Sequence, residues 1–536
     1  MTITQWFVFF LVIQVIHFLG TWKLYVKAGR QAWEAAIPIY NAIVLMKIIN
    51  RPKWWVILLF LPIINLLMFP VIWVETIRSF GFNKNTDSIL VILTLGLYIF
   101  YINYVAEGAY IEDRSLKPRT AAGEWVSSIV FAIVAATLVH TYFMQPYTIP
   151  SSSLEKSLLI GDFLFVSKFH YGARVPMTTV AAPMVHDTIP ILKKKSYLFS
   201  DDLTKKETSL LNKLQLPYLR LPGFQKIARN SIVVFNQPAD TLLDMNDFHP
   251  DRNYYKPIDK KTNLVKRCVG VPGDTLQIID GYIFINGKRT ELPDRAKPQY
   301  NFFINTEGQE INQNSLKDRY GAREGARDQQ GNFALARNEE KIGYYLTLTD
   351  QEAARISKNP SVKNIEKLLQ PKGVGEDVFP RVPSLGWNND NFGPIYIPQK
   401  GKTVKLDRNS LPFYKRIIGE YEQNNLIVNG DDILINGKEA DSYTFKQDYY
   451  WMMGDNRQNS LDARYWGYVP FDHVVGKPVF IWLSWETNGK GLNKIRWDRM
   501  FTTVGGSGEP VSYFKFFIIA LALWLGFDFY RKRKKA

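Results

Sequence analysis

Long apolar runs separated by short basic loops fill the first 145 residues, and one further apolar run lies near the end of the chain. A helix needs about 20 predominantly apolar residues to cross the roughly 30 Å hydrocarbon core of a membrane. The pattern therefore predicts five transmembrane helices, at about residues 6–22, 54–74, 89–105, 125–143 and 514–529. Within the second run, Pro62, Asn65 and Pro70 predict a kinked or protein-packed helix, because a carbonyl freed in lipid needs another partner.

The basic residues of the loops predict an orientation. Lys and Arg gather in residues 23–53 and 107–124, and the tail after Tyr530 reads Arg-Lys-Arg-Lys-Lys-Ala. Cytoplasmic loops of membrane proteins carry an excess of Lys and Arg. We therefore expect these three segments on the cytoplasmic side and residues 145 to about 510 on the outer side, in a multi-pass protein.

The outer part has a different pattern, in which short alternating or β-branched runs are separated by Gly, Pro, Asn and Asp. Such runs predict strands and a mainly β fold. The predicted strands lie at residues 163–168, 231–235, 263–269, 276–285, 433–435 and 478–483. The sequence Ile-Asn-Gly-Lys begins at Ile285 and again at Ile435, and each copy predicts a hairpin.

Residues 291–430, between the two hairpins, predict a smaller α+β domain inserted in the β fold. Thr349-Asp-Gln-Glu352 has the form of a capping box and predicts a helix that ends before Pro360, and a second helix is predicted at residues 412–422. The polar residues of 305–340 predict a mobile loop. The predicted domain organisation is 1–122 for an N-terminal membrane region of three helices, 123–145 for an anchor helix, 146–290 and 431–503 for the two parts of the β domain, 504–512 for a linker and 513–536 for the last helix and basic tail.

Composition narrows the function. The net charge of +16 occurs together with 14 Trp and several membrane-length apolar runs, so membrane lipid is the expected partner and nucleic acid is not. A single cysteine, Cys268, excludes an internal disulfide framework, and its place in an apolar strand predicts a core residue rather than a nucleophile. HExxH and GxSxG are both absent, which argues against a zinc protease and an α/β-hydrolase. No metal or cofactor is expected.

Three stretches carry the candidate chemistry. The first, beginning Ile149-Pro-Ser-Ser-Ser, predicts an exposed turn that leads into a strand, and taken alone it is only a turn. The second, Val265-Lys-Arg-Cys-Val-Gly-Val-Pro-Gly-Asp274, places a lysine within an apolar strand. The third runs from Met453 to Gly467. Together with the short strand beginning at Ser231, these stretches resemble in order and spelling the sequence boxes of bacterial type I signal peptidases, membrane-bound Ser/Lys proteases.

The resemblance covers residues 145–290 and 427–485 and implies the site residues. Ser153 would be the nucleophile and Lys266 the general base, since burial in an apolar strand can lower the pKa of a lysine by several units. The Ser151 hydroxyl and the Ser153 backbone N–H would bind the oxyanion. The supporting roles fall to Ser460, which would orient the Lys266 amine, and to an ion pair of Asp462 with Arg464. Shallow apolar pockets for small substrate side chains would be lined by Tyr147, Ile149, Leu264 and Val265.

The serine box departs from the family pattern Pro-Ser-Gly-Ser-Met-x-Pro-Thr-Leu. Here Ser152 replaces Gly, Leu154 replaces Met, and Lys156-Ser157 replaces Pro-Thr. Leu keeps the volume of Met, whereas Ser152 adds a β-carbon and the loss of Pro at 156 is expected to loosen the turn. These changes bear on substrate choice more than on catalysis, because all the reactive positions remain.

Three functions follow from the sequence. The first is a serine endopeptidase in the cytoplasmic (inner) membrane that removes signal peptides from exported preproteins at the outer face, with contacts to the secretion machinery. The second is a Ser/Lys protease of the same fold for one dedicated substrate, which the altered serine box would explain. The third is a non-catalytic membrane-anchored assembly protein that binds a partner through the insert.

Overall fold

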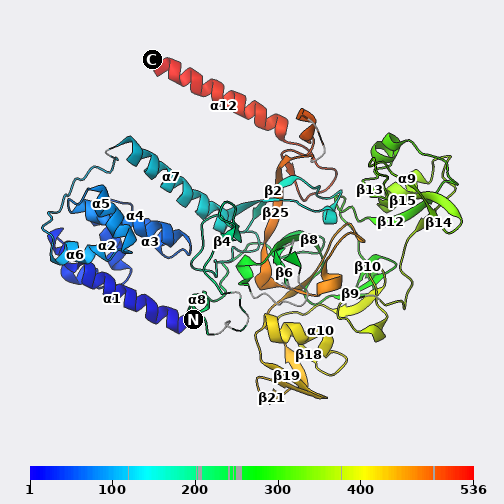
Figure 1. Cartoon of the computed structure of the whole chain (residues 1–536), viewed down its shortest axis with the longest axis horizontal. Helices are drawn as coiled ribbons and strands as arrows, with labels where there is room; N and C mark the ends of the chain where they lie inside the picture. Colours follow the sequence, from blue (N-terminus) through cyan, green and yellow to red (C-terminus); the bar gives the residue numbers. More distant parts are fainter. Residues whose placement is uncertain are drawn as a thin grey trace. The chain divides into compact units, whose positions relative to one another are not determined.

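The computed structural model describes residues 1–535 except 119, 201, 203, 205–207, 239–241, 245–246, 249–255, 376, 487–488 and 490. The chain forms two compact units (Figure 1). The helical unit comprises Met1–Met144, Ala173–Pro222 and Asp240–Thr262, and the β unit comprises Gln145–Gly172, Gly223–Ala239 and Asn263–Ala536.

The first six helices of the helical unit share one buried cluster, with Tyr25, Val44 and Ile102 among its members. Within it the Glu75 carboxylate pairs with Arg51 and Arg114, so that the buried charge is neutralised. The helices are α1 (Ile3–Lys27), α2 (Tyr40–Ile48), α3 (Trp55–Leu59), α4 (Ile64–Ser79), α5 (Asn85–Leu93), α6 (Tyr98–Tyr104), α7 (Ala121–Leu138) and α8 (Leu210–Lys213). Two short hairpins complete it, β3 (Thr188–Ile189) with β4 (Lys194–Lys195) and β6 (Leu242–Asp244) with β7 (Asp247–Phe248).

The prediction of five transmembrane helices is wrong in number. Among the described residues two helices are long and apolar enough to cross a membrane, Ile3–Lys27 and Ala121–Phe143, the second being α7 with the π turn Val139–Phe143 that continues it. The predicted second span is broken into α3 and α4, with Ile63 at a φ of 71° directly after Pro62. Pro70, by contrast, is accommodated inside α4.

The other two predicted spans also differ from continuous apolar helices. The third is α5 followed by α6 at a bend of 118°, and it counts as a crossing only if this bent pair is one span. The break contains Leu95 and Gly96, which both have positive φ. The last is α12 (Phe514–Lys535), whose apolar centre is short because charged residues lie close to both of its ends, at Lys515, Asp528 and Arg531.

The β unit is organised around an eight-stranded sheet, which confirms the mainly β fold expected for this part of the chain. The strand order is β1-β2-β25-β5-β8-β23-β24, and β26 pairs with β25. The strands are β1 (Met144–Thr148), β2 (Asp162–Ser167), β5 (Ile232–Asn236), β8 (Asn263–Gly270), β23 (Tyr449–Met453), β24 (Val469–Pro470), β25 (Val474–Ser484) and β26 (Thr502–Thr503). The pairings from β2 to β24 and that of β26 with β25 are antiparallel, so strands far apart in sequence become neighbours.

Smaller sheets extend this one. A four-stranded sheet has the order β11-β10-β9-β17, from β9 (Thr275–Ile279), β10 (Tyr282–Ile285), β11 (Lys288–Arg289) and β17 (Phe392–Tyr396). A five-stranded sheet, which we call the insert sheet, has the order β13-β15-β12-β16 with β14 on β15, from β12 (Tyr300–Asn305), β13 (Glu324–Gly325), β14 (Leu335–Asn338), β15 (Lys341–Leu348) and β16 (Asn364–Lys367). The remaining elements are β18 (Thr403–Lys405) with β22 (Ser442–Thr444), β19 (Leu426–Asn429) with β20 (Asp432–Ile435) and β21 (Lys438–Glu439), and the helices α9 (Asp350–Ile356), α10 (Leu411–Arg416) and α11 (Ala463–Trp466).

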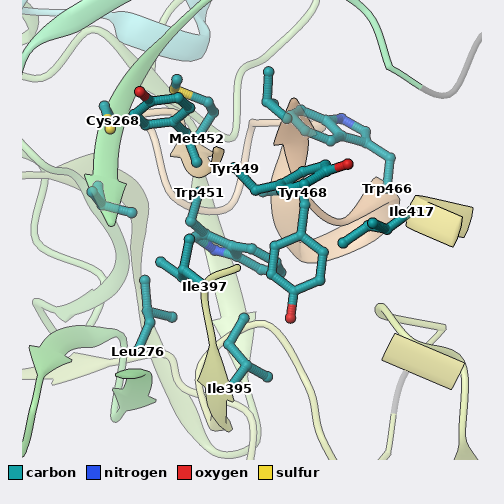
Figure 2. Close-up of a cluster of buried hydrophobic side chains, with 14 of the residues drawn as sticks. Cys268, Leu276, Ile395, Ile397, Ile417, Tyr449, Trp451, Met452, Trp466 and Tyr468 are labelled. Atoms are coloured by element: carbon teal, nitrogen blue, oxygen red, sulfur yellow. The ribbon is translucent and has the colours of Figure 1, made fainter. Parts of the chain in front are cut away.

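Aromatic side chains of β23 form the centre of the main core. Figure 2 shows Tyr449 and Trp451 packed with Tyr468, Trp466 and aliphatic residues of the four-stranded sheet. The Trp451 and Tyr468 rings meet edge to face at 5.5 Å between centroids. Cys268 is buried in the same cluster, and burial raises the pKa of its thiol, as expected for a core residue rather than a nucleophile.

Residues 305–340 were expected to form a mobile loop, and this prediction is wrong. They contribute two strands, β13 and β14, to the insert sheet. Their few apolar side chains, such as Leu316 and Phe333, are buried in a cluster with Tyr344 and Leu346 of β15. A polar composition therefore did not exclude order here, because a small number of well-placed apolar residues anchors the segment.

Candidate active site

The serine-rich stretch folds as a turn between β1 and β2. Ser151 is extended and exposed, and Ser152–Leu154 then form one turn of 3₁₀-helix in which Ser153 is buried. The three serines therefore do not lie along one extended chain, because the extended conformation ends at Ser151. Since Ser153 lies in the first turn of this helix, its backbone N–H has no acceptor within the helix and is available to a ligand.

Lys266 lies in β8 between two neighbouring strands. It pairs with Val233 of β5, and its side chain is only 5% exposed. Burial lowers the pKa of the Lys266 amine to about 8, and the charges of Asp462, which raises it, and Arg464, which lowers it, have smaller effects. A lysine with this pKa is partly neutral near neutral pH, as a general base must be.

Gly454 brings the serine turn and the lysine strand together. Met453 of β23 pairs with Arg267 of β8, so the antiparallel register, continued by one residue, places Gly454 beside Lys266. A β-carbon at Gly454 would lie 2.6 Å from the Ser153 carbonyl oxygen and 2.2 Å from Ser460 Oγ. Ser153, Lys266 and Ser460 thus surround a position where only glycine fits.

An ion pair of Asp462 with Arg464 lies behind Gly454. Asp462 accepts the Gly454 N–H at 3.0 Å, and Arg464 Nε donates to Asp462 Oδ1 at 2.9 Å. Both residues are fully buried. Burial alone would raise the pKa of Asp462, but the Arg464 guanidinium outweighs it and holds that pKa below its usual value.

Ser460 does not form the hydrogen bond to the lysine that the resemblance implies. Its Oγ is buried and has no hydrogen-bond partner in the described part of the chain, so the expected bond to the Lys266 amine is not formed here. In substrate-free enzymes such catalytic bonds are often long and tighten only when the substrate binds.

Three of the four expected pocket residues lie together. Ile149 is a buried member of a cluster that also holds Leu154 and Val234, and Tyr147 and Val265 pack against it half-buried. Leu264 packs instead against the main core. Neighbouring residues of a strand point to opposite faces, so β8 cannot present Leu264 and Val265 to one pocket.

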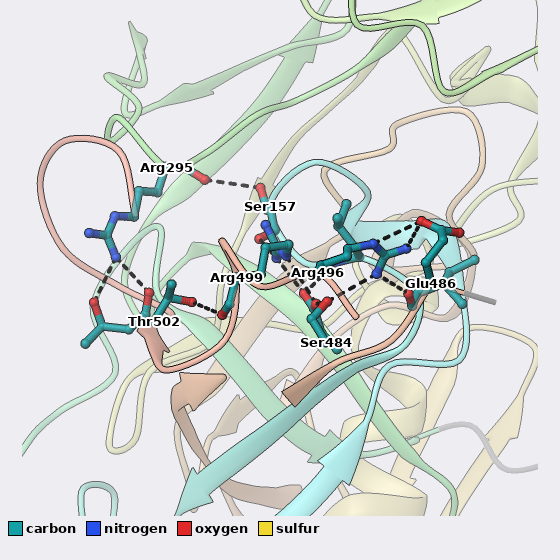
Figure 3. A network of polar contacts seen from close by, with 11 residues as sticks. Ser157, Arg295, Ser484, Glu486, Arg496, Arg499 and Thr502 are labelled. Atoms are coloured by element: carbon teal, nitrogen blue, oxygen red, sulfur yellow. Dashed lines mark hydrogen bonds and ion pairs between the residues drawn. The ribbon is translucent and has the colours of Figure 1, made fainter. Parts of the chain in front are cut away.

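Polar residues that the sequence did not single out hold the far end of the turn. Arg267, next to Lys266, pairs with the buried Asp455 at 2.5 Å, and the Ser157 hydroxyl donates to that carboxylate, also at 2.5 Å. The same hydroxyl lies 3.2 Å from the Arg295 carbonyl oxygen. Figure 3 shows this contact, with Arg499 close by. Arg499 donates to the Ser157 carbonyl at 3.4 Å. The sequence did contain a signal for these contacts. Arg267 lies in an apolar strand and Asp455 directly follows Gly454, and a buried charge needs a partner.

Comparisons with known proteins show the family of the chain. A family model described as "Signal peptidase, peptidase S26" matches residues 122–354 and 357–485, more than half of the 536 residues. The chain belongs to the signal peptidase S26 family. A second model, described as "Family of unknown function (DUF5684)", matches residues 33–113 of the helical unit.

The curated relatives of this S26 protein have low sequence identity to it, but the similarity extends over most of each chain. "Signal peptidase I" of Buchnera aphidicola subsp. Schizaphis graminum is 25% identical over 371 residues, which cover 67% of this chain and 75% of the relative. "Signal peptidase I" of Helicobacter pylori is 23% identical over 395 residues, 71% of this chain and 92% of the relative. "Signal peptidase I" of Haemophilus influenzae is 21% identical over 403 residues, 73% of this chain and 79% of the relative.

Proposed function

We infer that this chain is a membrane serine endopeptidase that removes signal peptides from exported preproteins with a Ser/Lys dyad. The observation that carries the inference is the meeting of a buried serine turn and a buried lysine at Gly454. The family match and the signal peptidase I relatives support the same function.

In the proposed mechanism the neutral Lys266 amine takes the proton of the Ser153 hydroxyl as its oxygen attacks the scissile carbonyl. The oxyanion accepts hydrogen bonds from the Ser153 N–H and the Ser151 hydroxyl. The lysine then gives the proton to the leaving amine, which frees the mature protein and leaves the signal peptide as an ester on Ser153. Water, deprotonated by the same amine, hydrolyses the ester and restores both groups.

The remaining assigned residues have supporting roles in this proposal. Ser460 orients the amine once the substrate excludes water, and the Asp462–Arg464 pair fixes the loop that carries Ser460. Tyr147, Ile149 and Val265, which share one cluster, are the proposed floor of the apolar subsites. Leu264 acts indirectly, through the packing of β8 on the main core.

We place the β unit on the outer face of the cytoplasmic membrane of a protein with at least two crossings. Basic residues such as Lys47, Arg51 and Lys117 lie between α1 and α7, which supports a cytoplasmic location for this segment. Ser153 follows Phe143 by ten residues, so the site stays close to the bilayer that presents signal peptides. Cysteines introduced at Lys27 and Ser315 should label from opposite sides, and labelling from the same side would refute the orientation.

The direct test is cleavage of a preprotein by the purified full-length protein in detergent or lipid vesicles. Wild type should release a mature protein with a new N-terminus, and Lys266→Ala should release none. Cleavage that Lys266→Ala retains would refute the dyad. No cleavage of any substrate by wild type would refute the proposed function and favour an assembly protein.

The altered serine turn is the observation that favours a dedicated substrate. Ser152 and Lys156 replace the Gly and the Pro of the family pattern on either side of Ser153. Several unrelated signal peptides should therefore be compared in the same assay. Similar kcat/KM values would indicate a general signal peptidase, and cleavage of a single one would indicate a specialised protease.

A further inference from the structure

The serine turn contains a residue in an unusual backbone conformation. Lys156, three residues after Ser153, has a φ of 68°. Non-glycine residues seldom adopt positive φ, and such a conformation costs on the order of 1 kcal/mol unless the surroundings hold it. The family pattern has Pro here, whose ring fixes φ near −65°, so Pro could not adopt the observed conformation. Some other feature must hold this turn.

The side chain of Lys156 forms an ion pair with Glu352, in the first turn of α9, the helix that directly follows β15 of the insert sheet. Only 10% of the lysine side chain and 16% of the glutamate side chain are exposed. A mostly buried pair is poorly screened by salt, and breaking it strands a charge. This contact joins residues 196 positions apart in the sequence.

Glu352 is itself firmly positioned. Its Oε2 accepts the Thr349 N–H at 2.8 Å, and its own N–H donates to Thr349 Oγ1 at 3.2 Å, which completes the capping box of α9. The Gly321 backbone lies against the carboxylate, because a β-carbon there would come within 2.3 Å of Oε1. The acceptor offered to Lys156 is therefore a fixed one.

Two further contacts join the same turn to the insert. Gln299, directly before β12, donates to the Glu155 carbonyl at 2.7 Å. Asn456 donates its backbone N–H to the Ser153 carbonyl at 3.1 Å and its side-chain N–H to Glu324 of β13 at 2.6 Å. A single residue, Asn456, thus links the Ser153 carbonyl to the insert sheet.

We propose that the insert sheet positions the catalytic turn, with Lys156 and Glu352 as its main positioning pair. This inference rests on the proposed function, because it takes Ser153 as the nucleophile. In the family pattern a proline ring would restrict the turn from within, whereas here an ion pair to the insert holds it from outside. Through this pair the insert sets the geometry of Ser153.

The test compares Glu352→Gln and Lys156→Met in the full-length protein on a preprotein substrate. Gln at this position still completes a capping box, so α9 should keep its fold. Each variant should lower kcat at least about tenfold, since a displacement near 1 Å at a reacting group can cost as much as 10²-fold. KM should change less than about twofold. Each single variant strands a charge and should lower Tm, so kcat is compared well below the Tm of every variant, where its loss should persist. Lys156→Arg, which keeps the charge, should retain most of the activity.

A matched control and a double variant complete the design. Glu366→Gln removes another carboxylate of the insert sheet, which pairs with Lys341 on the surface, and should leave kcat unchanged. The double variant Lys156→Met/Glu352→Gln should be no worse than either single variant, because both remove one contact.

Three results would overturn the proposal: wild-type kcat in Glu352→Gln, additive losses in the double variant, or a loss of kcat that only follows a fall in Tm. The proposed function fails differently. Activity retained by Ser153→Ala would refute the nucleophile and leave the Glu352 results to be explained by another site.

Discussion

The pH dependence of cleavage tests the site most directly, because it reports the environment of Lys266. A free lysine has a pKa near 10.4, so at pH 7 only about 1 in 2,500 amines is neutral. Burial in β8 lowers the pKa of Lys266 to about 8. The neutral fraction then becomes about one tenth at pH 7 and about nine tenths at pH 9. Burial thus increases the fraction of neutral Lys266 at pH 7 by roughly 200-fold.

The assay is kcat/KM on a fixed signal-peptide substrate between pH 6 and 10, because this ratio follows the ionisation of the free enzyme. We expect a rise of about tenfold from pH 7 to 9, with an inflection near pH 8. Lys266→Arg should be inactive throughout, since a guanidinium does not lose its proton in this range.

A second buried group near Ser153 requires a control. Burial, with a smaller contribution from the nearby Glu324 carboxylate, raises the pKa of Glu155 to about 7. Glu155→Gln should change the height of the profile and leave its inflection in place. A kcat/KM that still rises steeply at pH 10 with no inflection below it would refute the effect of burial, and an inflection that disappears in Glu155→Gln would assign it to the glutamate.

Three further predictions follow from the serine turn and its surroundings. Ser153→Ala should abolish cleavage, Ser151→Ala should lower kcat by about 10² to 10³, and Ser152→Gly should leave kcat nearly unchanged. These values are measured by steady-state kinetics, with Tm as a check on folding. Activity in Ser153→Ala with none in Ser152→Ala would show that Ser152 is the nucleophile. Gly454→Ala should lower both kcat and Tm, because the added methyl would overlap the Ser153 carbonyl oxygen and Ser460 Oγ; normal kinetics would show that the site has room. The raised pKa of Glu155 favours its protonated form in the folded protein, so this residue destabilises the fold increasingly as pH rises from about 4.5 to 7. Glu155→Gln should therefore raise the unfolding free energy at pH 8, by at most about 3 kcal/mol, and have little effect at pH 4, and an equal gain at both pH values would contradict the assignment.

Signals contained in a few neighbouring residues predicted the structure well. Both Ile-Asn-Gly-Lys copies form hairpins, with Ile285 paired to Lys288 and Ile435 to Lys438. The Asn and Gly of each turn have positive φ, as a tight two-residue hairpin requires. The capping box at Thr349 likewise begins α9. In these cases the local chain already determines the conformation.

Signals that depend on length and average polarity were less reliable. An apolar run shows that a segment avoids water, but it does not show whether the segment crosses a membrane as one helix. In the predicted third span, positive φ values at Leu95 and Gly96 divide the run into two helices. For the polar segment 305–340 the error was the opposite one, because a mobile loop was predicted and the segment is ordered. Leu316 and Phe333 are buried by strands that lie outside this segment in the sequence.

The candidate site shows the same division. Its proposed reactive residues come from short motifs. The contacts that hold them could not be predicted, since they join positions far apart in the sequence. Lys156 is the clearest case. Within the motif it replaces a proline, and this replacement predicts a looser turn. In the folded chain it has the opposite meaning, because its φ excludes proline and its charge is bound by Glu352. A departure from a family motif is therefore no measure of lost function until the partner of the new side chain is known.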